Sequence, residues 1–243
     1  MEQRERVVLF EKKDDIGIIC LNRPKEKNAF NEEMFLLFED FLKRADDDDS
    51  IRCIILKGNG KAFCTGIDLS LISNKDEVEI FFWMKKLQRI MNLLREISKP
   101  VISMVQDLAL AFGIGLVAAS DIAIAAKGAR FGAIAINIGL FCMGPGVFLM
   151  QNIGPKKAFE LLFTGKIIDA DEALKIGLIN EVVQPEDLNT RAISLAKEIS
   201  SKDMWAVKLG KRFFYQSLEE STNLGSELAS HYFSLLFSKW NKK

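Results

Sequence analysis

The sequence predicts an α/β core followed by a helical C-terminal region. Short apolar runs alternate with helical periodicity through roughly the first three quarters of the 243 residues. From Glu186 onward, apolar residues keep helical spacing alone. A strand, a turn and a helix follow one another directly between Lys99 and Asp121. We therefore place an α/β core at residues 1–185 and a helical region at residues 186–243.

The composition excludes several classes of protein. The chain carries 33 basic and 33 acidic residues, so it offers no broad charge for nucleic acid or an anionic membrane. No apolar run reaches the roughly 18 residues of a membrane span, and the charged N-terminus lacks a signal-peptide core. The four cysteines form no CxxC pair, and His231 is the single histidine. We expect a soluble cytoplasmic protein without a metal site.

The elements follow from these periodicities in chain order. Asn31 is expected to cap a helix that ends near Ala45, and a second long helix must end before Pro100. Residues 58–69 are predicted to form a loop. Strands are expected at 7–10 and 16–21, as a hairpin, and at 52–57, 101–105, 121–126 and 179–183. Helices are expected at 32–45, 77–97, 113–120, 145–152, 156–164, 170–175, 188–199, 204–217 and 218–239.

The stretch KPVISMVQDLALAFGIGLVAASD organises the functional prediction. Residues 111–115 turn the chain from a buried strand into a helix whose first N–H groups have no internal partner. The helix dipole there favours negative charge, and glycines let another molecule approach the backbone. Such a turn can hold an anion, or an oxygen that becomes anionic during a reaction.

Four segments resemble, in order and spacing, the enoyl-CoA hydratase/isomerase (crotonase) superfamily. They are LNRPKEKNAFNEEM, KGNGKAFCTGIDLS, KPVISMVQDLALAFGIGLVAASDIAIAAKGARFG and LLFTGKIIDADEALKIGLINEVV, and the match covers about Val7 to Val183. Within the family, INIGLFCMGPGVFL resembles the enoyl-CoA hydratase domain-containing protein 3 type.

The resemblance implies a fold and a class of ligand. The fold is a superhelix of ββα units that forms two near-perpendicular sheets with surrounding helices. The C-terminal helices of this family usually assemble homotrimers, often paired into homohexamers. The ligands are acyl-CoA thioesters of fatty acid metabolism, so coenzyme A arrives as part of the substrate and no cofactor is bound permanently.

In this family, two peptide N–H groups hold the thioester oxygen as it gains enolate charge. By position these are the N–H groups of Ile67 and Phe112. The family usually has consecutive glycines where this chain has Ala111, Phe112 and Gly113. The ring of Phe112 must therefore point away from the thioester, because it would otherwise block the site.

The chemistry departs further from the family. Hydratases of this family use two glutamates to place and activate the water that is added. The matching residues in this chain are Gly115 and Ala135, which cannot transfer a proton. Ordinary 2-enoyl-CoA hydration remains the family default but is expected to be inefficient. Three hypotheses stay open: an enzyme with another proton-transfer group, a noncatalytic or regulatory acyl-CoA binder, and a scaffold whose cavity Phe112 fills.

Other polar groups are weaker candidates. Asp107 precedes the organising turn and could act as acid or base, or cap backbone N–H groups. Asp68 and Asp121 are interpreted as structural. Cys64 and Cys142 have no basic partner nearby in sequence, and His231 is expected on a helix face.

The resemblance also implies where the coenzyme and the acyl group bind. The residues matched to coenzyme A contacts are Lys25, Lys27, Ala29, Thr65, Ile67, Asp68 and Leu69, although exposed lysines are as readily explained by solvation. Candidates for the acyl pocket are Phe81, Phe82, Trp83, Leu140, Phe141 and Val147. Side chains of these types are more often part of the core.

Overall fold

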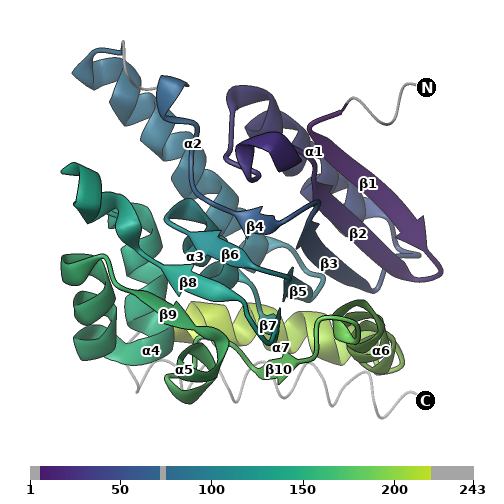
Figure 1. The fold of residues 1–243 in the computed structure, drawn as a ribbon. Helices are drawn as coiled ribbons and strands as arrows, with labels where there is room; N and C mark the ends of the chain where they lie inside the picture. The colour runs from purple at the N-terminus through teal and green to yellow at the C-terminus, as the bar shows by residue number, and fades with distance from the viewer. Residues whose placement is uncertain (1–5, 72–74, 220–243) are drawn as a thin grey trace.

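A computed structural model describes residues 6–71 and 75–219, and it contains two sheets surrounded by helices (Figure 1). The six-stranded sheet has the order β1-β2-β3-β5-β7-β10. Its strands are β1 (Val8–Lys13), β2 (Ile16–Leu21), β3 (Cys53–Gly58), β5 (Val101–Val105), β7 (Ile122–Ala126) and β10 (Glu181–Val183). The hairpin predicted at the N-terminus is confirmed, since β1 pairs antiparallel with β2. The other neighbours in this sheet are parallel.

The four-stranded sheet has the order β4-β6-β8-β9. Its strands are β4 (Ala62–Cys64), β6 (Leu108–Leu110), β8 (Arg130–Gly132) and β9 (Ile167–Asp169). The sequence did not predict these strands, and β4 lies inside the segment expected to be a loop. Each has three residues, too few to show the alternation that marks a strand.

The helices agree more closely with the prediction. They are α1 (Glu32–Asp47), α2 (Glu77–Glu96), α3 (Phe112–Ala119), α4 (Met143–Thr164), α5 (Ala170–Lys175), α6 (Leu188–Ser200) and α7 (Met204–Glu219). Short 3₁₀ helices are η2 (Pro24–Glu26), η3 (Leu69–Leu71) and η4 (Ile134–Ile138). The side chain of Asn31 caps α1 as predicted.

Two predicted helices are joined in α4. Gly154 has a non-helical backbone there, at φ 75° and ψ 160°, directly before Pro155. Residues 145–152 and 156–164 therefore lie in separate helical segments, although α4 begins at Met143 rather than at Pro145. Within residues 6–71 and 75–219, every helix is too short or too polar to cross a bilayer. The predicted helix at 218–239 lies almost wholly outside the described residues.

Two apolar clusters fill the space around the larger sheet. One combines the sheet with buried side chains of α1, α2, α3 and α4 and with β4, β6 and β8. The other lies between the sheet and α6, where Ile55, Ile102 and Met104 meet Ala192 and Ala196. The predicted two-sheet α/β fold is thus confirmed. The proposed boundary after residue 185 falls between β10 and α6.

Candidate functional site

Three parallel strands bring the predicted site to one edge of the smaller sheet. β4 pairs in parallel with β6, and β6 in parallel with β8. Their carboxyl ends therefore meet at the same edge. Ile67 follows β4, Phe112 follows β6 and Ala135 follows β8. The structure brings these three segments together although they are far apart in the sequence.

The chain segments that carry Ile67 and Phe112 are in direct contact. An ideal Cβ on Gly113 would lie 2.1 Å from the carbonyl oxygen of Cys64. An ideal Cβ on Gly66 would lie 3.2 Å from the Cβ of Ala111 and 3.9 Å from the backbone nitrogen of Phe112. Gly66 has φ +124°, which L side chains rarely adopt. Glycine at both positions lets the end of β4 lie against the start of α3.

The N–H of Ile67 is directed away from its neighbouring chain segment. Phe30 donates to the carbonyl of Gly66 at 3.0 Å and accepts from the N–H of Asp68 at 2.9 Å. Because peptide groups alternate along an extended chain, the N–H of Ile67 faces the side opposite Phe30. Among the described residues, no acceptor is recorded for the N–H of Ile67 or for that of Phe112.

Phe112 opens α3 at a turn with unusual backbone geometry. Ala111 precedes it at φ 50° and ψ −110°, and its N–H donates to the carbonyl of Gly132 at 2.8 Å. The N-cap side chain makes no hydrogen bond, and the first turn of α3 contains no acidic residue. The positive end of the helix is therefore not neutralised by its own first turn.

The ring of Phe112 lies in the core. Its centroid is 5.0 Å from that of Phe30 and 5.8 Å from that of Phe35, and the residue is 4% exposed. The aromatic side chain packs on Phe35 of α1 and on Phe30, which precedes α1, whereas the peptide N–H belongs to the turn. The unusual residue at this position thus contributes packing through its side chain and a donor through its backbone.

The carboxylates near the site are already engaged or lie elsewhere. Asp68 accepts from Ser70 and, at 3.1 Å, from Arg23. The hydrogen bonds from Ser70 and the nearby Arg23 guanidinium hold the pKa of Asp68 below its ordinary value, so it is ionised and poorly suited as a base. In the structure Asp68 links two loops through its hydrogen bonds with Arg23 and Ser70.

Asp107 is not brought to the two N–H groups. It precedes β6, whereas Phe112 follows that strand, and three strand residues span about 10 Å. One Oδ of Asp107 lies 3.9 Å from a guanidinium nitrogen of Arg130, at the start of β8. Asp107 therefore does not lie beside the N–H groups of Ile67 and Phe112.

The thiols are buried and protonated. All four cysteines are free and buried. Burial raises the pKa of Cys64 to about 12 and also raises the pKa of Cys142. Neither is a thiolate at neutral pH, and among the described residues no cation lowers the pKa of either thiol as a nucleophilic cysteine requires.

Alkylation tests this assignment. We expect iodoacetamide at pH 8 to label none of the four cysteines in the native protein within a time that fully labels them in guanidinium chloride, because burial disfavours the thiolate. Mass spectrometry of the native and denatured samples measures both. Rapid native labelling of Cys64 or Cys142 would contradict the assignment and revive a thiol nucleophile.

The segment proposed for coenzyme A is anchored to β4. The side chain of Asn28 is fully buried and donates to the carbonyls of Asn59 and Ala62. Thr65 Oγ1 donates to the carbonyl of Lys27 at 3.2 Å, and Arg23 donates to the carbonyl of Ala29. Lys25 and Lys27 are exposed beside this anchor, as is Leu69 beyond Asp68. Sequence reasoning missed the anchoring roles of Arg23 and Asn28, which depend on distant partners.

The residues considered for an acyl pocket divide into two groups. Trp83 is buried and packs on Phe35, with ring centroids 5.0 Å apart, and Phe141 is partly buried. The others are largely exposed: Phe81, Phe82, Leu140 and Val147. The structure does not gather this set around one cavity.

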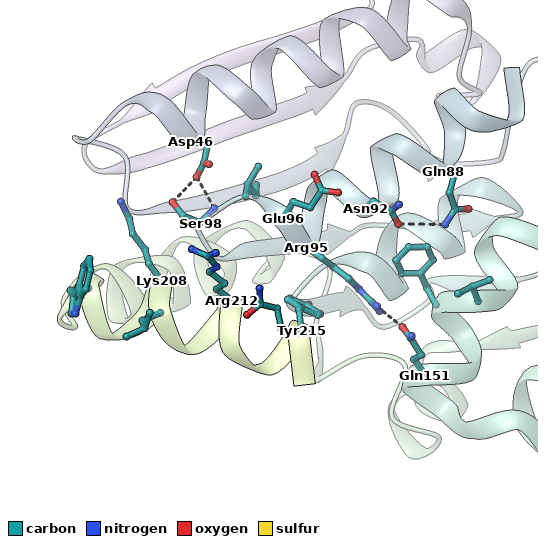
Figure 2. Close-up of a pocket in the computed structure, with 16 residues that line it drawn as sticks. Asp46, Gln88, Asn92, Arg95, Glu96, Ser98, Gln151, Lys208, Arg212 and Tyr215 are labelled. Atoms are coloured by element: carbon teal, nitrogen blue, oxygen red, sulfur yellow. Dashed lines mark hydrogen bonds between the residues drawn. The ribbon is translucent and has the colours of Figure 1, made fainter. Parts of the chain in front are cut away.

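A cavity of about 630 Å³ lies between α2, α4 and α7 (Figure 2). The guanidinium of Arg95 stacks on Phe148 and Tyr215 there and donates to Gln151. Gln88 and Asn92 line it from α2, and apolar contacts come from both other helices. None of the residues assigned to the thioester or to coenzyme A lines this cavity.

Comparisons with known proteins identify the family of the chain. A family model described as "Enoyl-CoA hydratase/isomerase" matches residues 11–243. "Crotonyl-CoA hydratase" of Syntrophomonas wolfei is 32% identical over 238 residues, which cover 97% of this chain and 92% of that protein. "Enoyl-CoA hydratase domain-containing protein 3, mitochondrial" of Mus musculus is 36% identical over 234 residues, 94% of this chain and 77% of that protein.

A solved structure described as enoyl-CoA hydratase from Mycobacterium smegmatis superimposes with a TM-score of 0.92. It is 34% identical, and the match covers 95% of this chain and 91% of that one. The chain therefore belongs to the enoyl-CoA hydratase/isomerase (crotonase) family, in which it is of the enoyl-CoA hydratase domain-containing protein 3 type.

Proposed function

We propose that this protein binds an acyl-CoA thioester and polarises its carbonyl between the N–H groups of Ile67 and Phe112. The observation that carries this proposal is the contact between the end of β4 and the start of α3 around Gly113. It holds two N–H donors, neither of which has an acceptor within residues 6–71 and 75–219, beside a helix start that has no side-chain cap. Losing one donor of such a pair typically costs about 2.7–4 kcal/mol of transition-state stabilisation.

The reaction that follows polarisation is expected to differ from efficient hydration. The 2-enoyl-CoA hydratase and isomerase reactions are the family default, yet Gly115 and Ala135 carry no acid or base. A positioned acid or base contributes about 10²–10⁴-fold to such a rate. The same absence supports a second candidate, a noncatalytic or regulatory acyl-CoA binder that retains the fold.

The remaining parts of the proposal follow from the family. Lys25 and Lys27 would meet phosphates of coenzyme A, which enters as part of the ligand, and no permanently bound cofactor is invoked. We infer a homotrimer or homohexamer, which sedimentation can measure. A cytoplasmic location is proposed because all four cysteines are free.

A spectroscopic assay tests polarisation without requiring turnover. We expect a conjugated 2-enoyl-CoA to bind and to absorb at longer wavelength on the protein, because hydrogen bonds to the carbonyl draw electron density toward its oxygen. Titration followed by difference absorbance measures both the affinity and the shift. An enoyl-CoA that binds without any shift, or does not bind, would refute the proposal.

Turnover separates the enzyme from the noncatalytic binder. A panel of enoyl-, dienoyl- and malonyl-type thioesters is incubated with the protein and analysed by chromatography. Product from any of them supports an enzyme, and binding without product supports the second candidate. Asp68→Asn and Asp107→Asn serve as controls: rapid crotonyl-CoA hydration that survives both changes would overturn the expectation that hydration is inefficient without the two glutamates.

A further inference from the structure

We propose that Met91 of α2 limits the length of the acyl chain, by separating the proposed thioester site from the cavity between α2, α4 and α7. The inference rests on the proposed function, since it concerns the ligand of that site. Met91 is fully buried and contacts the first turns of α3 and α4, of which α3 begins at the proposed site.

The first contact is with α3. Gly115 lies three residues after Phe112, which is about 4.5 Å along the helix. An ideal Cβ on Gly115 would be 2.9 Å from Met91 Sδ and 3.0 Å from the Cβ and Cγ of Pro145. The space in which family hydratases place a glutamate side chain is therefore occupied by a thioether and a proline ring.

The second contact leads to the cavity. An ideal Cβ on Gly144, in the first turn of α4, would be 3.0 Å from Met91 Cε and 3.1 Å from Gln88 Oε1. Gln88 is one of the residues that line the cavity, as is Asn92, which directly follows Met91. Met91 thus contacts Gly115 on one side and, on the other, lies beside Gly144 and Gln88 at the end of the cavity.

The cavity offers apolar surface beyond that barrier. Its lining includes the side chains of Ile97, Val147, Phe148, Trp205 and Leu209. Moving a methylene group from water to such an apolar surface is favourable. A short acyl chain ends before Met91, whereas a longer one would need the space that Met91 fills in order to reach the cavity. The structure assigns Met91 the role of a specificity-determining residue.

The test compares butyryl-CoA with octanoyl-CoA by isothermal titration calorimetry. We expect the unsubstituted protein to favour butyryl-CoA, and Met91→Ala to tighten octanoyl-CoA at least tenfold relative to butyryl-CoA, because a single methylene in an apolar pocket discriminates by about 10–200-fold. Met91→Val, which removes less volume, should shift the ratio in the same direction by a smaller factor. If the Met91→Ala protein does not fold, the Met91→Val protein still tests the inference.

The matched control is Met104→Ala. Met104 is also a buried methionine, but it belongs to β5 and packs in the separate cluster beneath α6. This variant should leave the ratio of the two affinities unchanged. If the Met91 variants fold and the ratio of the two affinities is unchanged, this inference is overturned and the proposed function is not. Failure of the unsubstituted protein to bind either thioester would instead overturn the proposed function, and this inference with it.

Discussion

Gly113→Ala will lose acyl-CoA binding and much of the protein's stability. The new Cβ would lie 2.1 Å from the carbonyl oxygen of Cys64 and 2.8 Å from its carbonyl carbon. Both atoms belong to the backbone, so no change of rotamer relieves the overlap. α3 must then move away from β4, which separates the N–H of Phe112 from that of Ile67. Overpacking costs about 1–3 kcal/mol and occasionally more, and we expect the upper end.

Thermal unfolding and titration with butyryl-CoA measure the two effects. At about 2–4 °C per kcal/mol for a chain of this size, the melting temperature should fall by roughly 6–12 °C. Gly210→Ala is the matched control, because in the part of the chain that the structure describes nothing outside its own helical turn lies within 4 Å of its ideal Cβ, and it occupies the interior of α7. That change should stabilise the protein by about 1 kcal/mol. A Gly113→Ala protein that melts and binds like the unsubstituted one would contradict the contact.

Asp121→Ala is expected to produce the second large effect, by detaching α7 from the core. One Oδ of Asp121 accepts from the N–H of Val101 and from Lys211 Nζ, both at 2.7 Å. The other accepts from the hydroxyl of Tyr215 at 2.9 Å. The side chain of Lys211 is 6% exposed and that of Asp121 is 16% exposed. Removing the carboxylate leaves a buried ammonium group without its counter-charge, which typically costs about 3–5 kcal/mol.

A double-mutant cycle in urea measures this coupling. Asp121→Ala combined with Lys211→Met should cost less than the two single changes added together, because the double variant leaves no unpaired buried charge. Lys197→Ala is the control, since it breaks an exposed pair with Asp14 at 3.5 Å. Such pairs contribute about 0–1 kcal/mol. Strict additivity in the cycle would show that the buried pair does not hold α7.

The elements that could be predicted from sequence are those specified by local patterns. α2 carries apolar residues at helical spacing over several turns, and Asn31 caps α1 through its own side chain. The hairpin of β1 and β2 shows runs long enough to recognise. By contrast, β4 and β6 exist because they pair with each other across more than forty residues of chain, and three residues alone carry no such signal.

The candidate site divides in the same way. Ile67 and Phe112 could be proposed as donors because the family resemblance places their backbone N–H groups at recognisable turns. The contact of Met91 with Gly115 could not, since helical periodicity marks Met91 as apolar without stating which helix it meets. The same holds for Asp121, whose partners on α7 lie about ninety residues later in the chain.

The close packing around Gly115 also constrains how this protein can change over generations. A glutamate there would crowd Met91 and the ring of Pro145 at once, and overpacking of this kind costs about 1–3 kcal/mol. A pair of carboxylates at positions 115 and 135 would therefore require smaller residues at 91 and 145 as well as the two acids. A glutamate at 115 alone would destabilise the protein without supplying the second carboxylate.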